Sequence, residues 1–294
     1  MRAGLVVWPR ESLLGGEATM PSRDIDTGSV ELLAKQDGGV LTLTLNRPAA
    51  RNAMTGAMIE ALSRQLELAE ADSSVRCVVL TGAGKGFCAG GDVKGMASAS
   101  EDDGSALLID EFIAAQRRAQ HATAGRLFKM PKPTLAVING AAAGAGLSLA
   151  LACDLRIMSS AAVLTTAFAK VGLSGDWGGT YYMTQLVGPA KAREFYYLSD
   201  RVDAASALSL GLTNWLCAPD ELDVKAAEVA GRLAAGPGVA FRYMKENLNR
   251  ALPGGHDDCL DVEATHHVHC FATEDNKSAV EAFIAKREPV FGGR

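Results

Sequence analysis

The chain has 294 residues, a length that allows one large domain or two small ones. Lysine and arginine total 29 and aspartate and glutamate 34, so the formal net charge is −5, and no long basic run is available to neutralise nucleic-acid phosphates. With 48% hydrophobic and 21% charged residues, the composition is that of a globular protein rather than a disordered or collagen-like chain. We therefore expect no nucleic-acid partner.

The cysteines and the N-terminus predict a cytoplasmic protein. Six cysteines are spread singly, without CxxC pairs, which favours reduced thiols over a disulfide scaffold. The apolar run at residues 5–8 is too short for the core of a signal peptide. Residues 1–28 are polar and unpatterned, so we expect a disordered N-terminal extension, within which Met20 is an alternative start.

One stretch resembles a membrane span. Residues 135–153 carry no charge and place Gly140 and Gly144 in the GxxxG spacing of transmembrane helix dimers. Three glycines, Asn139 and Ser148 interrupt the stretch, which favours a buried strand that turns into a buried helix. We expect no membrane association.

In chain order, the first predicted elements alternate between strand and helix. Residues 40–45 alternate apolar and polar side chains, as in a half-buried strand. Residues 55–71 repeat apolar side chains at helical spacing. A buried strand follows at residues 77–80 and runs into a glycine-rich turn at 81–86.

The later elements continue this alternation. Small acidic residues at 97–105 predict a surface loop, followed by a helix through residues 107–113. We predict a strand at 134–138, a helix at 146–153 and a strand at 155–158, and alternation of this kind predicts parallel pairing. Beyond Trp215 the pattern is helical, with helices predicted at 222–233, 240–251, 263–272 and 278–286.

Glycine-rich turns follow the predicted strands without forming a nucleotide-binding motif. The glycine spacing after Leu80 and after Ile138 departs from GxGxxG, and no GxxxxGK[ST] occurs. The small side chains at Gly90, Gly91 and 144–146 instead let an acceptor oxygen approach backbone amides closely. The second turn starts a predicted helix, whose dipole also favours negative charge.

A set of longer motifs points to one family. They are LNRP with NAM at 45–54, FCAGGDVK at 87–94, AVINGAAAGAG at 136–146, GLSGDWGGT at 172–180 and FIAKR at 283–287. In order and spacing, over about residues 30–290, they resemble the enoyl-CoA hydratase/isomerase (crotonase) superfamily.

The resemblance implies an α/β fold, a crotonase-like spiral of ββα units with a helical C-terminal trimerisation region. It implies a spiral core at residues 29–215 for CoA binding and catalysis and an oligomerisation region at 216–294, in a homotrimer or dimer of trimers. It also implies acyl-CoA thioester substrates, no cofactor beyond the CoA of the substrate, and an oxyanion hole formed by the amides of Gly91 and Ala145. Each such donor is worth roughly 3–4 kcal/mol to an enolate.

The candidate base departs from the hydratase pattern. Where hydratases of the family carry two glutamates that hold and activate water, this sequence has Ser148 and Phe168, and neither can act as a carboxylate base. Asp176 falls where the family's dienoyl-CoA and ring-modifying isomerases place a catalytic aspartate. Because one carboxylate can move a proton between two carbons, we favour an acyl-CoA isomerase. The alternatives are an enoyl-CoA hydratase and a non-catalytic acyl-CoA-binding protein.

Asp176 and Ser148 also have structural interpretations, in which neither side chain takes part in catalysis. Asp176 precedes a predicted helix and could cap it through its side chain. Ser148, inside a helix of alanines and leucines, could bond its own backbone.

We also predict contacts with CoA. The candidate residues are Arg51, Ala89, Gly91, Asp92, Lys94 and Lys286. Lys94 matches a family position near the nucleotide part of CoA, and Arg51 and Lys286 are cations that could reach phosphates, Lys286 from a neighbouring subunit. Solvated surface cations are the alternative.

A histidine-rich segment near the C-terminus could bring two or three zinc ligands together. The candidate sets are His266 with His269, and Glu263 with His267 and Cys270. A closed zinc site needs four ligands and no second group recurs, so we expect helix packing and no metal. Cys88 has no histidine nearby in sequence, which favours a small buried thiol over a nucleophile.

Overall fold

The computed structural model describes residues 22–92 and 109–294, and within these ranges seven strands form a large mixed sheet. In spatial order they are β1 (Arg23–Ile25), β2 (Leu32–Asp37), β3 (Val40–Leu45), β4 (Cys77–Gly82), β6 (Thr134–Ile138), β8 (Leu155–Ser159) and β11 (Trp215–Cys217). The pairs β1–β2 and β2–β3 are antiparallel, and the pairs from β3 to β11 are parallel. The predicted parallel pairing is confirmed.

The burial of each strand follows from its place in this sheet. Side chains of β2 and β3 alternate between buried and more exposed, because one face of this antiparallel edge is covered. The first four residues of β4 and all of β6 are buried, because helices cover both faces there.

Four short strands form a second sheet in the described residues. In spatial order they are β10 (Val202–Asp203), β9 (Val163–Thr165), β7 (Ala141–Ala143) and β5 (Gly86–Cys88). The pairs β5–β7 and β7–β9 are parallel. The chain crosses from the large sheet to the small one three times, from β4 to β5, from β6 to β7 and from β8 to β9. The parallel pairing therefore brings the ends of β5 and β7 side by side.

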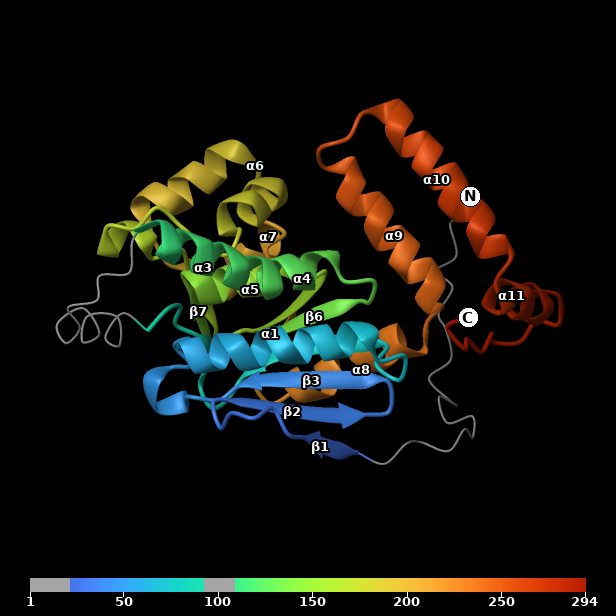
Figure 1. Ribbon diagram of the computed structural model, residues 1–294, viewed down its shortest axis with the longest axis horizontal. Coiled ribbons are helices and arrows are strands. Elements are labelled where there is room, and N and C mark those ends of the chain that lie inside the picture. Colours follow the sequence, from blue (N-terminus) through green and yellow to red (C-terminus); the bar gives the residue numbers. More distant parts are fainter. Residues whose placement is uncertain (1–21, 93–108) are drawn as a thin grey trace, which may run out of the picture.

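Helices cover both faces of the large sheet. On one side lie α1 (Gly56–Ala71), α3 (Ile109–Ala122), α4 (Ala124–Lys129) and α5 (Ala145–Ala152), and on the other α8 (Leu222–Ala235) (Figure 1). Val78 and Leu80 pack in the core with the first group, whereas Cys77 and Val79 pack against α8. All eight residues of α5 are buried, as expected of a helix that is apolar all round.

The remaining helices follow the strands of the small sheet and the last part of the chain. The short helix η1 (Pro48–Ala50) precedes α1, and η2 (Phe168–Val171) precedes α6 (Gly179–Leu198). Then come α7 (Ala204–Ser209), α9 (Gly238–Ala251), α10 (His256–Phe271) and α11 (Glu274–Ile284). Figure 1 shows α9 and α10 as a hairpin that projects from the body, with α11 at its base.

A buried lysine attaches this hairpin to the core. Lys245 of α9 is 8% exposed, and its Nζ donates to the Leu127 carbonyl at 2.8 Å and to Asp154 Oδ2 at 2.9 Å. Large apolar side chains of the three last helices remain exposed, among them Met244, Leu248, Leu260, Val268, Phe271, Phe283 and Ile284. A trimer or dimer of trimers that covers them stays a prediction.

Two expectations need correction. Strand β1 lies inside residues 1–28, which we expected to carry no structure, because three residues are too few to show a period-two pattern. Helix α10 begins at His256 rather than at 263, because its first turns are polar and lack an apolar repeat. Residues 1–21, with Met20, and the predicted loop at 97–105 lie outside the described residues.

The suspected membrane stretch is part of the core. No helix in the described ranges is long and apolar enough to cross a membrane. The uncharged residues 135–153 instead contribute to β6 and form β7 and α5. The six cysteines are all described and form no disulfide.

Candidate active site

Two glycine-rich turns contact each other where β5 and β7 end. Gly90 and Gly144 both have positive φ, +96° and +52°, which side chains rarely adopt. A Cβ on Gly90 would lie 3.1 Å from the Ala143 carbonyl oxygen and 3.5 Å from the Ala145 nitrogen. A Cβ on Gly146 would overlap Cys88. The sequence needs glycine here because backbone packs directly on backbone.

The neighbouring Gly91 amide points away from its own strand partner. Met54 N–H donates to the Gly90 carbonyl at 2.8 Å, and Asp92 N–H donates to the Met54 carbonyl at 3.0 Å. Because N–H groups of successive extended residues point to opposite sides, the Gly91 N–H faces away from Met54. No hydrogen bond between described residues uses it.

The Ala145 amide is at the N-terminus of α5. Ala145 is the first residue of this helix, and the preceding Gly144 provides no side-chain cap. Amides of the first helical turn have no acceptor within the helix, and the helix dipole makes their surroundings attractive to negative charge. The two turns thus contribute one available amide each, from Gly91 and Ala145.

Asp176 lies in the loop that enters α6, and its side chain does not cap that helix. The residue preceding α6 is Gly178, and the Gly179 N–H donates to the backbone carbonyl of Asp176 at 3.1 Å. The adjacent Trp177 is buried and donates through Nε1 to Thr123 Oγ1 at 2.8 Å, which fixes the loop. The helix-cap interpretation of Asp176 is therefore wrong.

The carboxyl group of Asp176 is in an unusual environment. Its Oδ1 is buried and has no hydrogen-bond partner among the described residues. Burial raises the pKa of Asp176 from 3.8 to about 6, because removal from water penalises the charged form. A carboxyl with such a pKa can both take and return a proton near neutral pH.

Ser148, Phe168 and Tyr196 meet beside this loop. Ser148 Oγ donates to the Gly144 carbonyl at 3.3 Å, so the expected bond to its own backbone is confirmed. A Cβ on Gly179 would overlap Ser148 Oγ and lie 2.7 Å from Tyr196 Oη. The rings of Phe168 and Tyr196 stack, with centroids 5.8 Å apart and planes 13° from parallel.

Our sequence analysis missed Tyr196. It lies twenty residues after Asp176, on α6, and no spacing rule connects the two. A weak signal was present in Gly175 and Gly179, because glycines four residues apart leave room for one large side chain. A Cβ on Gly175 would lie 2.8 Å from Tyr196 Cε1.

The structure brings several predicted CoA contacts together. Ala89 N–H donates to the Arg51 carbonyl at 3.0 Å, and both residues are exposed beside the Gly90 turn. Asp92 is held by Arg47, whose Nη1 donates to Asp92 Oδ2 at 2.9 Å.

Two predicted CoA contacts lie elsewhere. Lys286 is exposed and follows α11, which lies at the opposite end of the protein from β7 (Figure 1). Any role for Lys286 at this site would thus need another subunit. Lys94 lies outside the described residues.

Asn52 holds the first turn in place. The residue is fully buried and has φ +57°. Its Oδ1 accepts from the Arg47 amide at 2.9 Å, and its Nδ2 donates to the carbonyls of Ala83 and Gly86 at 2.9 and 2.8 Å. One side chain thereby ties η1 to the turn between β4 and β5, close to the Gly91 amide.

The remaining sequence candidates have structural roles. Burial raises the pKa of the Cys88 thiol to about 12, so it stays protonated, as expected of a packing residue. His266 of α10 stacks on Tyr243 of α9, with ring centroids 4.3 Å apart, and its Nδ1 contacts Asn247 Oδ1. In residues 22–92 and 109–294, no group of three or more His, Cys, Asp or Glu is placed to hold a metal.

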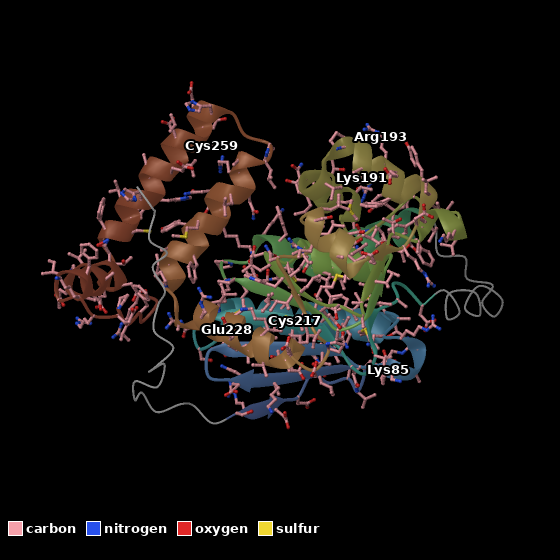
Figure 2. The ribbon with its side chains drawn as sticks, turned by 180° about the vertical axis from the view of Figure 1, so that it is seen from behind. Lys85, Lys191, Arg193, Cys217, Glu228 and Cys259 are labelled. Carbon is pink, nitrogen blue, oxygen red and sulfur yellow. The ribbon has the colours of Figure 1, made fainter. Side chains whose placement is uncertain are left out.

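A cavity of about 560 Å³ borders this region between η2 and α6. The residues that line it include Ser174, Thr180, Thr184, Tyr196 and Tyr197. Arg193, labelled on α6 in Figure 2, contributes a cation.

Comparison with known proteins identifies the family. A family model described as Enoyl-CoA hydratase/isomerase matches residues 35–294. The chain is 35% identical to 1,2-epoxyphenylacetyl-CoA isomerase of Escherichia coli (strain K12) over 266 aligned residues. The alignment covers 90% of this chain and 98% of that protein. It is 33% identical to short-chain-enoyl-CoA hydratase of Clostridium acetobutylicum over 258 aligned residues. That alignment covers 87% of this chain and 95% of the hydratase.

A solved structure has the same architecture. The crystal structure of an enoyl-CoA hydratase from Polaromonas sp. JS666 superimposes with a TM-score of 0.82 at 32% identity, over 88% of this chain and 99% of that one. The predicted crotonase spiral is therefore confirmed, and the relatives include both hydratases and isomerases. The chain belongs to the enoyl-CoA hydratase/isomerase (crotonase) family of acyl-CoA enzymes.

Proposed function

We propose that the protein is an acyl-CoA isomerase that moves a proton between two carbons of a thioester substrate through Asp176. The observation that carries the proposal is the state of this half-buried carboxyl, whose Oδ1 is buried without a hydrogen-bond partner among the described residues and whose pKa is raised to about 6. The two positions of the hydratase glutamates hold Ser148 and Phe168, which supports isomerisation over hydration.

The amides of Gly91 and Ala145 would stabilise the enolate. Removing a proton beside a thioester places negative charge on the carbonyl oxygen, and donors fixed in advance around that oxygen lower the barrier. Both amides are held by backbone packing, and the Ala145 amide adds the dipole of α5. Loss of one such donor costs roughly 10²–10³ in kcat.

Asp176 would take a proton from one carbon and return it to another. For a 3-enoyl-CoA, the ionised carboxylate removes a C2 proton, the electrons form a dienolate, and the protonated carboxyl delivers the same proton to C4. The product is the 2-enoyl-CoA, with no atom gained or lost. A pKa near 6 leaves the carboxylate mostly ionised at neutral pH and still able to hold the proton.

We propose that CoA binds along the exposed rim next to the Gly91 amide. Arg51 and Ala89 would lie along the CoA moiety, Asp92 would keep Arg47 in place, and Lys94 would approach the nucleotide. Lys286 would come from a neighbouring subunit of a trimer or dimer of trimers. A cytoplasmic location also stays a prediction.

Asp176→Asn tests the proposal. Asparagine keeps the shape of the side chain but cannot take the proton, so isomerisation of 3-hexenoyl-CoA should fall by roughly 10²–10⁴ while CoA affinity changes little. Turnover equal to that of the wild type would remove Asp176 from the mechanism.

Product analysis separates the alternatives. The 33% identity to a short-chain-enoyl-CoA hydratase keeps a hydratase that uses Asp176 as the second candidate. In ¹⁸O-labelled water only hydration puts the label into the product. Tight acyl-CoA binding without exchange of C2 protons in deuterated water would support a non-catalytic binding protein instead.

A further inference from the structure

Tyr196 lies between the cavity described above and the Asp176 loop. It lines the cavity of about 560 Å³ together with Thr180 and Ser174, which are neighbours of that loop. Neither Asp176 nor Ser148, both of which are described, belongs to the residues that line this cavity. The Tyr196 side chain is thus next to the cavity on one side and next to the backbone of the Asp176 loop on the other.

The ring packs along the loop on both sides of Asp176. Its Cε1 lies 2.8 Å from the position of a Cβ on Gly175, and its Oη lies 2.7 Å from the position of a Cβ on Gly179. Side chains at either glycine would displace the ring. The ring therefore covers the backbone of the segment that presents Asp176. It leaves no room for a methyl group at either Gly175 or Gly179.

The environment of Tyr196 keeps it neutral and in place. Phe168 stacks on its ring, and the ring is half-buried on α6. Burial, together with the negative charge of Asp176, raises the pKa of the phenol above its ordinary value. No hydrogen bond between described residues uses its hydroxyl. Tyr196 is thus a neutral, packed group that fills space beside a carboxylate without a hydrogen bond to it.

The reaction of a carboxylate base depends on what it can reach. If water contacts it beside a conjugated thioester, the base can take a proton from the water while the oxygen bonds to C3 and C2 receives a proton, so that one water is added. If water is excluded, the same base can only exchange protons with carbon.

We propose that Tyr196 restricts this enzyme to proton transfer by keeping the water of the neighbouring cavity away from the buried Oδ1 of Asp176. The inference rests on the proposed isomerase function. Its physical basis is volume, because a water molecule occupies about 30 Å³ and a tyrosine ring with its hydroxyl fills the space of more than one. Removing the ring would connect the cavity to Asp176, whereas removing the hydroxyl alone would leave the barrier in place.

Three variants test this role. Tyr196→Ala removes the ring, Tyr196→Phe keeps it, and Tyr197→Ala is the matched control, because Tyr197 lines the same cavity but is 74% exposed. With 3-hexenoyl-CoA in ¹⁸O-labelled water, Tyr196→Ala should form labelled 3-hydroxyhexanoyl-CoA at least about tenfold above the wild-type background. Tyr196→Phe and Tyr197→Ala should stay at background. Isomerisation by Tyr196→Ala without labelled product would overturn the proposal.

A second measurement does not depend on activity. The pKa of Asp176, followed by ¹³C NMR of aspartate-labelled protein and assigned with Asp176→Asn, should fall by at least about one unit in Tyr196→Ala and stay near 6 in Tyr196→Phe. An unchanged Asp176 pKa in a folded Tyr196→Ala protein would show that water does not enter, and the inference would be wrong. If the Asp176 pKa falls in Tyr196→Ala but the wild-type protein exchanges no substrate protons in deuterated water, the isomerase function is refuted and the barrier role of Tyr196 is not.

Discussion

Replacing Asp176 with asparagine should make the protein more stable at neutral pH while it removes activity. In the folded protein the carboxylate is partly desolvated and lacks a hydrogen-bond partner among the described residues, so its charge opposes folding. A rise of the pKa from 3.8 to about 6 corresponds, at about 1.4 kcal/mol per unit, to an upper bound of roughly 3 kcal/mol. Because the side chain is only half-buried, solvent screening reduces this, and we expect about 1 kcal/mol.

The sign of this effect depends on pH. The raised pKa means that folded Asp176 binds its proton more tightly than the unfolded chain does, so its unfavourable contribution is present above about pH 6 and disappears as the pH falls to 3.8. Urea unfolding at pH 7 and at pH 4 measures it. Asp176→Asn should be more stable than the wild type at pH 7 and equal to it at pH 4.

A matched carboxylate provides the control. Asp92 is held by Arg47 at 2.9 Å, so Asp92→Asn should lower stability at pH 7 instead of raising it. If Asp176→Asn is destabilised at pH 7 as Asp92→Asn is, then Asp176 has favourable interactions in the folded state, and our interpretation of its pKa is refuted.

Other consequences follow from the same site and from the C-terminal attachment. The kcat/KM of the wild type should fall about tenfold per pH unit below pH 6, as Asp176 gains its proton, and a pH–rate profile with an unchanged rate at pH 5 would contradict this. Gly179→Ala places a methyl group against Tyr196 Oη, so turnover should fall by about 10²-fold in a folded protein, measured by isomerase assay and circular dichroism. Lys245→Met leaves Asp154 without its buried cation and should lower the free energy of unfolding by about 3 kcal/mol, measured by urea denaturation, whereas a loss under about 0.5 kcal/mol would mean that the pair does not hold α9.

The parts of the fold with a strong local period were predictable. Strand β3 alternates apolar and polar side chains, and α1 repeats apolar residues at helical spacing, because each buries one face against the core. Strand β1 and the polar first turns of α10 gave no such signal. Their positions depend on pairing and packing with segments that are distant in the chain.

The candidate site was predictable only where backbone chemistry decides it. Gly90 and Gly144 indicate close backbone contact directly, since side chains rarely adopt their φ angles. The orientation of Asp176 could not be derived, because a helix cap and a buried base have the same sequence pattern. Tyr196 could not be found, because its proximity to Asp176 results from the path of α6 past the loop.

The burial of α5 has a consequence for synthesis of the chain. With every residue buried and no charge, this helix of eight residues is too short to persist alone in water. It packs against β6, β7 and α4, and also against α6, which ends at Leu198. A nascent chain that has emerged only as far as β9 must therefore leave an apolar surface open to chaperones or to other chains, and translation through α6 closes it.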